Sequence, residues 1–459
     1  MKTNMVQTSI VRASPAPTLV VRPTSVAKLD SDTRWLQWSW FMLVLFAALP
    51  LSVLDLGWIV YAVETAADVY VFSTVLGSIA NVASVRYLAF GIALIVGIWE
   101  TRRRSEPWPA VHLALLGYAL WAAASIAWSI SPALAAIKVV ALLASVLVSV
   151  ALAARIDGIG RLIGATLSAV IVVMAVAIVV AAAMPDYGFD PYGNWYPRLG
   201  GQLIHPNELA QCAGMFIVLI LGWPSGWSVR SRWSLAVMGA AVVAATQSRT
   251  TMLALIIAGA VWFLIRTAPA IRALSLGVGA LAILALGIGE LDLPGTLGYL
   301  ERGSTERMAD TIAQRVELWE YALEQGLGSL LVGQGFAVGS RIVLGPAFWW
   351  RPFHAHNLVL EILLNVGIVG VAIAGLATVL AVRSLLRLVR SGGDRSRQGA
   401  VGLTLLAFVV ALGVTERSFG GELSSAMIAF VIAIAIASVR LGQPSADHGG
   451  AAPARAASR

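Results

Sequence analysis

The stretch FHAHNLVLEILLNVGIVGV, at residues 353–371, places two histidines and an asparagine at the entrance of an apolar segment. From Asn357 to about residue 382, this segment has the length and composition of a membrane-spanning helix. Polar side chains are costly at membrane depth, so a cluster of them at the mouth of a span indicates a function. The fold and the site both depend on the side of the membrane that this mouth faces.

The whole chain has the composition of an integral membrane protein. Its 459 residues are 58% hydrophobic and 12% charged, with a mean hydropathy of +0.82, whereas about a quarter of the residues in a soluble domain are charged. Apolar runs of roughly 18–25 residues recur along the chain, which favours helical spans over an outer-membrane barrel. The single cysteine, Cys212, allows no internal disulfide and gives no evidence for a metal cluster. We therefore expect an all-α, polytopic membrane protein.

Hydropathy predicts about twelve membrane spans. Their approximate cores are 36–54, 69–99 (or only 86–99), 109–128, 134–154, 160–183, 205–222, 233–247, 249–266, 271–289, 357–382, 400–416 and 422–440. The polar segments 1–34 and 441–459 are expected to be disordered cytoplasmic ends that flank a membrane domain at 35–440.

Basic residues alternate between the loops that join these spans. Every second short loop is basic: 101–104, Arg155 with Arg161, Arg230 with Arg232, Arg266 with Arg272, and 383–397. Short basic loops remain in the cytoplasm, so the alternation predicts that both chain ends are cytoplasmic and that the mouth at 353–357 faces outward. These positions also explain the net charge of +8 without a nucleic-acid partner.

Two of the outward loops are long, at 184–208 and at about 290–354. The second loop precedes the tenth span and contains TERMADTIAQRVELWEYALEQG at 305–326. Apolar residues recur there at helical spacing, which predicts an amphipathic helix. They are Met308, Ile312, Val316, Trp319 and Leu323.

Polar side chains that are distant in the sequence share the outward membrane depth. They are His205, Arg249, Arg315, His354, His356, Glu416 and Arg417. Such a gathering is expected of a site at the outer leaflet that a lipid-linked substrate can reach.

Simpler structural interpretations stay open for the arginines. Arg249 alone fits an interfacial arginine whose charged end snorkels to water. Arg315 alone fits an ion pair with Glu317 or Glu320 on a solvated helix face.

Structural interpretations also stay open for the histidines. His205 precedes Pro206 and Asn207, a pattern typical of a helix start. On a helix, His354 and His356 would point about 200° apart. They also resemble half of a metal site, but the sequence offers no obvious third ligand.

The histidine motif at this mouth resembles that of a known family. His356 and Asn357 are followed after nine residues by Gly367 and then Gly370, which is similar to the motif of the bacterial O-antigen ligase and O-antigen polymerase superfamily. The similarity covers about 195–380, and the number of spans extends it to most of the chain.

Other segments strengthen this resemblance. Arg249 in SRTTMLALIIAG and Arg315 in QRVELWEYAL are similar in position to the two functional arginines of the family. RLGGQLIHPNELA, with Arg198, His205 and Asn207, also looks like a segment common in such proteins.

The resemblance implies a membrane glycosyltransferase in O-antigen or exopolysaccharide polymerisation or ligation. A glycan linked to undecaprenyl diphosphate would be moved to an acceptor hydroxyl on a glycan or glycolipid. The reaction would take place on the periplasmic side of the bacterial inner membrane. Expected partners are these substrates, the lipid bilayer and other polysaccharide assembly proteins.

The residue types suit this chemistry. A sugar hydroxyl is a weak nucleophile, so His356 is the expected general base. Arg249 and Arg315 are expected to hold the diphosphate in place of a metal ion, without a cofactor. Asn357 either orients His356 or binds sugar, and Glu361 either aligns a neighbour or is an interfacial acid. Further candidates for substrate binding are Arg198, His205, Asn207 and His354.

Alternatives to this function remain. A transporter or flippase would place ionisable groups near the bilayer midplane, where Lys138 is the exception and snorkelling would explain it. A non-catalytic assembly scaffold is the third class. Within the enzyme class, the scarcity of basic runs in the outward loops favours a polymerase over a ligase, whose core acceptor is highly phosphorylated.

Overall fold

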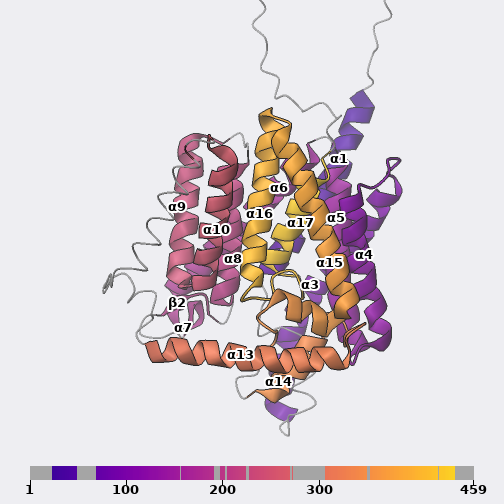
Figure 1. Ribbon diagram of the computed structural model, residues 1–459. Helices are drawn as coiled ribbons and strands as arrows, with labels where there is room; N and C mark the ends of the chain where they lie inside the picture. The colour runs from indigo at the N-terminus through magenta and orange to yellow at the C-terminus, as the bar shows by residue number, and fades with distance from the viewer. Residues whose placement is uncertain are drawn as a thin grey trace, which may run out of the picture.

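Long, nearly parallel helices make up the fold (Figure 1). The computed structural model describes residues 23–48, 69–155, 157–190, 197–201, 204–223, 227–268, 271, 305–348, 352–421 and 423–439. The described part is helical apart from a short antiparallel pair, β1 (Phe189–Asp190) with β2 (Arg198–Leu199). The predicted fold class, an all-α chain, is thus confirmed.

The helices follow the predicted segments closely. They are α1 (Pro23–Ala48), α3 (Val69–Arg102), α4 (Ala110–Ala124), α5 (Pro132–Ala153), α6 (Gly158–Ala183), α7 (Pro185–Gly188), α8 (Pro206–Gly222), α9 (Val229–Thr246), α10 (Arg249–Arg266), α13 (Thr305–Gly328), α14 (Gly339–Ala347), α15 (Leu358–Arg390), α16 (Gly393–Gly413) and α17 (Ser425–Ala437), with a 3₁₀ turn, η2 (Ser125–Trp128), after α4.

Six helical segments of the described residues are long and apolar enough to cross a membrane: α4 with η2, α5, α6, α10, α15 and α16. Helices α8 and α17 are apolar but shorter. The predicted span at 271–289 lies, apart from Ile271, outside the described residues, as do 1–22 and 440–459. The total of about twelve spans therefore stays a prediction.

Helix α1 begins at Pro23 and so includes residues 23–34 of the segment that was expected to be disordered. One expectation is wrong. Lys138 does not snorkel outward: it is buried in the bundle on α5, because neighbouring helices cover that face.

Helix α17 lies at the centre of the bundle. All of its residues from Ser425 to Ala437 are buried, as expected of a helix that is apolar all round. It packs against α5, α8, α15 and α16. The small alanines in SAMIAFVIAIAIA allow these neighbours to approach closely.

Helix α13 runs across one end of the bundle, roughly perpendicular to the long helices (Figure 1). Its buried residues Leu318 and Ala322 pack on Leu344 of α14 and Leu364 of α15. The predicted amphipathic helix is confirmed, but its packed face differs from the expected one. Val316 and Leu323, on the expected face, are exposed.

Helix α15 is interrupted at Gly367, where the backbone has φ 70° and ψ −174°. The segment after α13 supplies the hydrogen bonds that the interruption frees, which a membrane-embedded backbone requires. Gln334 N donates to Leu364 O at 2.9 Å, and Ile368 N donates to Leu330 O at 2.7 Å. A Cβ at position 367 would lie 2.3 Å from Leu331 O, so only glycine fits both the conformation and the space.

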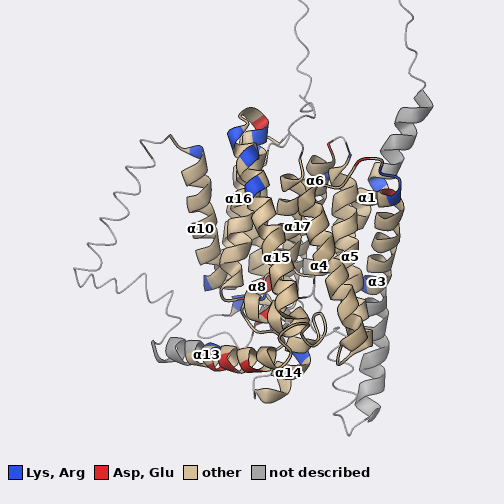
Figure 2. Ribbon diagram, turned by 45° about the vertical axis from the view of Figure 1, so that its right-hand side comes forward, with Lys and Arg blue, Asp and Glu red and all other residues tan. Residues whose placement is uncertain are grey.

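The basic loops gather at the end of the bundle opposite α13 (Figure 2). Arg397 Nε donates to Gly222 O at 2.7 Å, and Arg232 Nε donates to Ile220 O at 2.8 Å. Arg155 pairs with Glu100 at the same end. The predicted grouping of these loops on one side is confirmed, and we call this the basic end.

Substituting Gly367 with alanine should destabilise the protein by about 2 kcal/mol or more, because the left-handed backbone is strained for alanine and the methyl group meets backbone atoms. The matched control is Gly375→Ala on the same helix, where an added Cβ meets nothing within 4 Å. The thermal midpoint of the purified protein in detergent, followed by size-exclusion chromatography after heating, measures the difference. Equal midpoints for the two variants would contradict the packing at the interruption.

Candidate functional site

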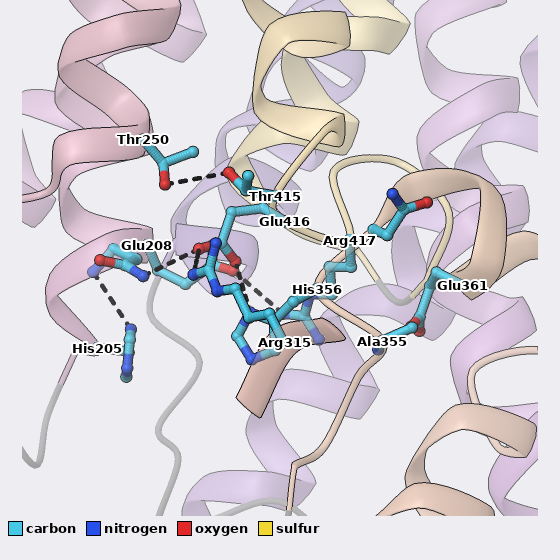
Figure 3. Close-up of polar contacts among 12 residues, drawn as sticks. His205, Glu208, Thr250, Arg315, Ala355, His356, Glu361, Thr415, Glu416 and Arg417 are labelled. Atoms are coloured by element: carbon cyan, nitrogen blue, oxygen red, sulfur yellow. Dashed lines mark hydrogen bonds and ion pairs between the residues drawn. The ribbon is translucent and has the colours of Figure 1, made fainter. Parts of the chain in front are cut away.

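Three helices begin around the turn 414–417, at the end of the bundle that α13 crosses (Figure 3). One polar side chain in the first turn or cap of each helix contacts this turn. The contacts are Asn207 Nδ2 of α8 to Glu416 Oε1 at 3.0 Å, Thr250 Oγ1 of α10 to Thr415 Oγ1 at 3.2 Å, and Asn357 Nδ2 at the α15 cap to Val414 O at 3.3 Å. The turn therefore fixes where α8, α10 and α15 start.

Glu416 is the centre of the polar cluster. It is only 4% exposed, and a buried carboxylate requires hydrogen bonds and positive partners. Besides Asn207, its oxygens lie 3.5 Å from His356 Nδ1 and 3.8 Å from Arg315 Nη2. Burial by itself would raise the pKa of Glu416, but the nearby His356, with Arg315 and His205, holds it below its usual value. Glu416 is thus a carboxylate at neutral pH.

His356 has a strained backbone. Its φ of 48° lies in the left-handed region, which costs a non-glycine residue about 1–2 kcal/mol. Nδ1 faces Glu416, and Nε2 is the second nitrogen of the ring. A carboxylate behind Nδ1 favours the tautomer in which Nε2 can accept a proton.

His354 lies beside His356, with ring centroids 4.0 Å apart. The expected divergence of the two rings is wrong, because residues 354–357 precede α15 and are not helical. The sequence offers no obvious third metal ligand, but in the structure Glu416 could be one, because the ligand atoms of His354, His356 and Glu416 all lie within 4.8 Å of one another. Within the described part of the chain, these three residues form a group that could hold a metal ion.

Arg198 supports the cluster from β2. Its guanidinium donates to Thr246 O at 2.9 Å and to Asn207 Oδ1 at 2.8 Å, and it lies 3.7 Å from Asp190. Burial lowers the pKa of Arg198, and the charge of Arg249 lowers it further against the opposing carboxylates. Arg249 is the first residue of α10 and directly precedes Thr250, which contacts Thr415.

His205 is the N-cap of α8, and its Nδ1 accepts from Asn207 N at 3.2 Å. The interpretation of His205 as a helix start is thus confirmed. Asn207 uses its amide oxygen for Arg198 and its amide nitrogen for Glu416. Both residues therefore build the frame around Glu416.

Asn357 and Glu361 lie at the edge of the cluster. The amide oxygen of Asn357 caps α15 by accepting from Val359 N at 3.0 Å and Leu360 N at 3.2 Å. Glu361 accepts a hydrogen bond from Ala355 N, in the residue directly before His356 (Figure 3). This placement favours the interpretation in which Glu361 aligns a neighbour.

Glu416 was not among the site residues predicted from the sequence, but the structure places it at the centre of the polar cluster. The sequence placed Glu416 and Arg417 at the outward side of the membrane. However, the residues TER at 415–417 belong to no motif that assigns them a role. Arg417 pairs with Glu208 at 3.2 Å beside the cluster. The available signal was a carboxylate in a short turn between two apolar spans.

Charged side chains of both signs gather in this cluster. The four arginines are Arg198, Arg249, Arg315 and Arg417, and the carboxylates are Asp190, Glu208 and Glu416, with Glu361 at the edge. The starts of α8, α10 and α15 add the positive ends of three helix dipoles. The arrangement can bind an anion while a histidine backed by a carboxylate accepts a proton.

Replacing Glu416 with glutamine should cost about 2 kcal/mol of stability at neutral pH, since His356 and Arg315 lose a charged partner. The lowered pKa means that Glu416 stabilises the fold above its ordinary pKa of 4.5, and that this contribution is lost as pH falls below it. The gap in Tm between wild type and Glu416→Gln should therefore narrow from pH 7 to pH 4. Exposed Glu320→Gln is the control, and a gap that stays constant or widens at pH 4 would contradict this role.

The comparisons with known proteins agree with the geometry. Residues 234–375 match a family model described as O-Antigen ligase, inside the stretch of about 195–380 over which the resemblance was noted. The match spans Arg249, Arg315 and His356, three residues of the cluster. A comparison with curated protein sequences found no match. The resemblance to the O-antigen ligase and O-antigen polymerase superfamily is thus confirmed over residues 234–375, which match its O-antigen ligase model.

Proposed function

We propose that this protein moves a glycan from undecaprenyl diphosphate to an acceptor hydroxyl, as a membrane glycosyltransferase of the O-antigen ligase and polymerase type. The observation that carries the proposal is the contact of buried Glu416 with His356 and Arg315. It joins a base to a cation within one cluster of a chain that carries the family domain.

In this proposal, His356 is the general base. Its Nε2 removes the proton of the acceptor hydroxyl as that oxygen attacks the anomeric carbon of the donor sugar. Glu416 stays ionised, holds Nδ1 and stabilises the imidazolium that forms. The bond from the sugar to the diphosphate oxygen breaks, and undecaprenyl diphosphate leaves.

The arginines stabilise the charge that develops on the leaving diphosphate. Arg315 lies beside His356 and Glu416 (Figure 3), and Arg249 starts α10, whose next residue, Thr250, contacts the turn at Thr415. Bidentate guanidinium contacts suit phosphate oxygens, and the starts of α8 and α10 add dipoles of the same sign. Asn357, His354 and His205 stay proposed sugar contacts at the rim.

A metal ion is not needed in this mechanism. His354, His356 and Glu416 could ligate one, but a metal ion there would compete with Arg315, which already contacts Glu416. A metal on His356 would also occupy the base. We therefore propose that bound metal inhibits the enzyme.

The acceptor is proposed to be the next lipid-linked repeat, so that the protein acts as a polymerase. Helix α13 crosses the cluster end and exposes Glu317, Glu320 and Glu324. These carboxylates would repel a highly phosphorylated core acceptor and tolerate a less charged glycan. The basic end is proposed to face the cytoplasm, which places the cluster on the periplasmic side of the inner membrane.

One observation favours the alternative of a flippase. The interruption of α15 at Gly367 is the kind of discontinuous helix that transporters use. However, the segment 330–335 fills this interruption with hydrogen bonds, and the polar cluster lies at one end of the bundle rather than at its middle.

Replacing His356 with alanine should reduce transfer by about 10²–10⁴-fold, because the base is lost. A gene deletion complemented by wild type or by His356→Ala, followed by analysis of surface glycan and lipid-linked intermediates, measures this. Accumulated single repeats on lipid indicate a polymerase, and accumulated long chains on lipid indicate a ligase. Full rescue by a normally expressed His356→Ala protein would reject the assignment.

Chelators should leave the activity of the purified protein unchanged, and Zn²⁺ should inhibit it by binding His354, His356 and Glu416. The measurement is transfer in EDTA, in Zn²⁺ and in Mg²⁺, with Mg²⁺ as the control because it binds histidine poorly. Activity that EDTA abolishes and a divalent cation restores would contradict a metal-free mechanism.

A further inference from the structure

We propose that Trp319 and Glu361 are positioning residues that hold His356 in its working orientation through the peptide groups of Ala355. The inference rests on the proposed role of His356 as base and extends it to two residues on other elements. Neither side chain needs to touch the substrate.

Every group of Ala355 is held by the protein. Its N–H donates to Glu361 Oε2 at 2.8 Å, and its carbonyl accepts from Trp319 Nε1 at 3.0 Å. Its methyl group is fully buried in an apolar cluster with Leu318 and Leu364. The residue directly before His356 therefore has no freedom to rotate without breaking at least one of these contacts.

Glu361 is itself firmly anchored. It is 2% exposed and also accepts from Ser340 Oγ of α14 at 2.7 Å and from Asn365 Nδ2 of α15 at 3.0 Å. Asn365 Oδ1 in turn accepts from Ser340 N at 3.0 Å. Two elements thus hold the carboxylate that holds Ala355.

The clamp opposes the strain at His356. A left-handed φ of 48° persists only where the surroundings over-determine it. The clamp fixes the peptide before this φ, and the Asn357 cap fixes the residue after it. Small rotations about the backbone of His356 would move its ring relative to Glu416, which lies 3.5 Å from Nδ1.

Helix α13 connects this clamp to the diphosphate site. Trp319 follows Arg315 by four residues, so both project from the same side of α13. Arg315 contacts Glu416 while Trp319 contacts Ala355. The seating of one helix therefore sets both a proposed phosphate ligand and the orientation of the base.

The test replaces Trp319 with phenylalanine, which keeps an aromatic ring and removes the N–H donor. The matched control is Trp128→Phe, which removes an indole bond of the same kind, to Val332 O at 3.1 Å, away from His356. We expect Trp319→Phe to lower kcat about 10-fold or more, since small misplacements of a catalytic group are costly, with KM for the lipid-linked donor within about twofold. Trp128→Phe should keep both constants.

Two outcomes would overturn the inference. One is a kcat for Trp319→Phe as high as that of Trp128→Phe. The other is an equal loss in both variants that follows their thermal stability, which indicates a structural role only.

Glu361 variants provide the second arm. Glu361→Gln keeps one oxygen that can accept from Ala355 N, so its kcat should exceed that of Glu361→Ala at equal KM. If Glu361→Ala does not fold, two comparisons still test the clamp. They are Glu361→Gln against wild type, and Trp319→Phe against Trp128→Phe. A kcat for Glu361→Gln no higher than that of a folded Glu361→Ala would contradict the clamp.

Failure of this inference differs from failure of the proposed function. An active His356→Ala protein rejects the base, and with it the clamp. An inactive His356→Ala protein beside a fully active Trp319→Phe protein rejects the clamp alone.

Discussion

A carboxylate buried at one end of a membrane bundle is the constraint on which the site depends. Glu416 is ionised and almost inaccessible to water, so it must be surrounded by donors and cations. Those partners come from α8, α13 and the segment before α15, which are far apart in the chain. Satisfying one charge therefore brings together the groups to which we assign glycosyl transfer.

The interrupted helix α15 solves a related problem. A glycine with positive φ breaks the helix at 367, and the chain segment 330–335 supplies new hydrogen-bond partners for the freed backbone groups. That segment leads directly from α13 to α14. The same interruption thus anchors α13 and α14 at the cluster end, where the segment before α15 carries His356 and the first turn of α15 carries Glu361.

The sequence predicted the repetitive features of the fold and missed those that depend on tertiary contacts. Apolar length identified α5, α6, α10 and α16, and charge alternation grouped the basic loops, because both signals are local. The amphipathic period placed α13 correctly but not its packed face, since Leu318 rather than Val316 meets the protein. Contacts with α14 and α15 determine which face of α13 is packed. The periodicity of apolar residues carries no information about these contacts.

The residues of the site also divide into those that the sequence indicated and those that only tertiary contacts bring out. His356, Arg249 and Arg315 were predicted because they stand in motifs that resemble a family. Glu416 lacked a motif, and its importance arises only from the side chains that meet it in space. The contact between the rings of His354 and His356 depends on a non-helical backbone, whereas the spacing was interpreted as helical. The clamp on Ala355 could not be predicted, since alanine carries no chemical signal.

The most direct test of the central claim is a reconstituted reaction. Purified protein in lipid nanodiscs would receive a synthetic oligosaccharide linked to undecaprenyl diphosphate, with EDTA present, and mass spectrometry would follow both products. We expect a longer lipid-linked glycan and an equal amount of released undecaprenyl diphosphate from wild type, and neither from Glu416→Ala or His356→Ala protein of matched thermal stability. Product formation by either variant at the wild-type rate would contradict the central role of this pair.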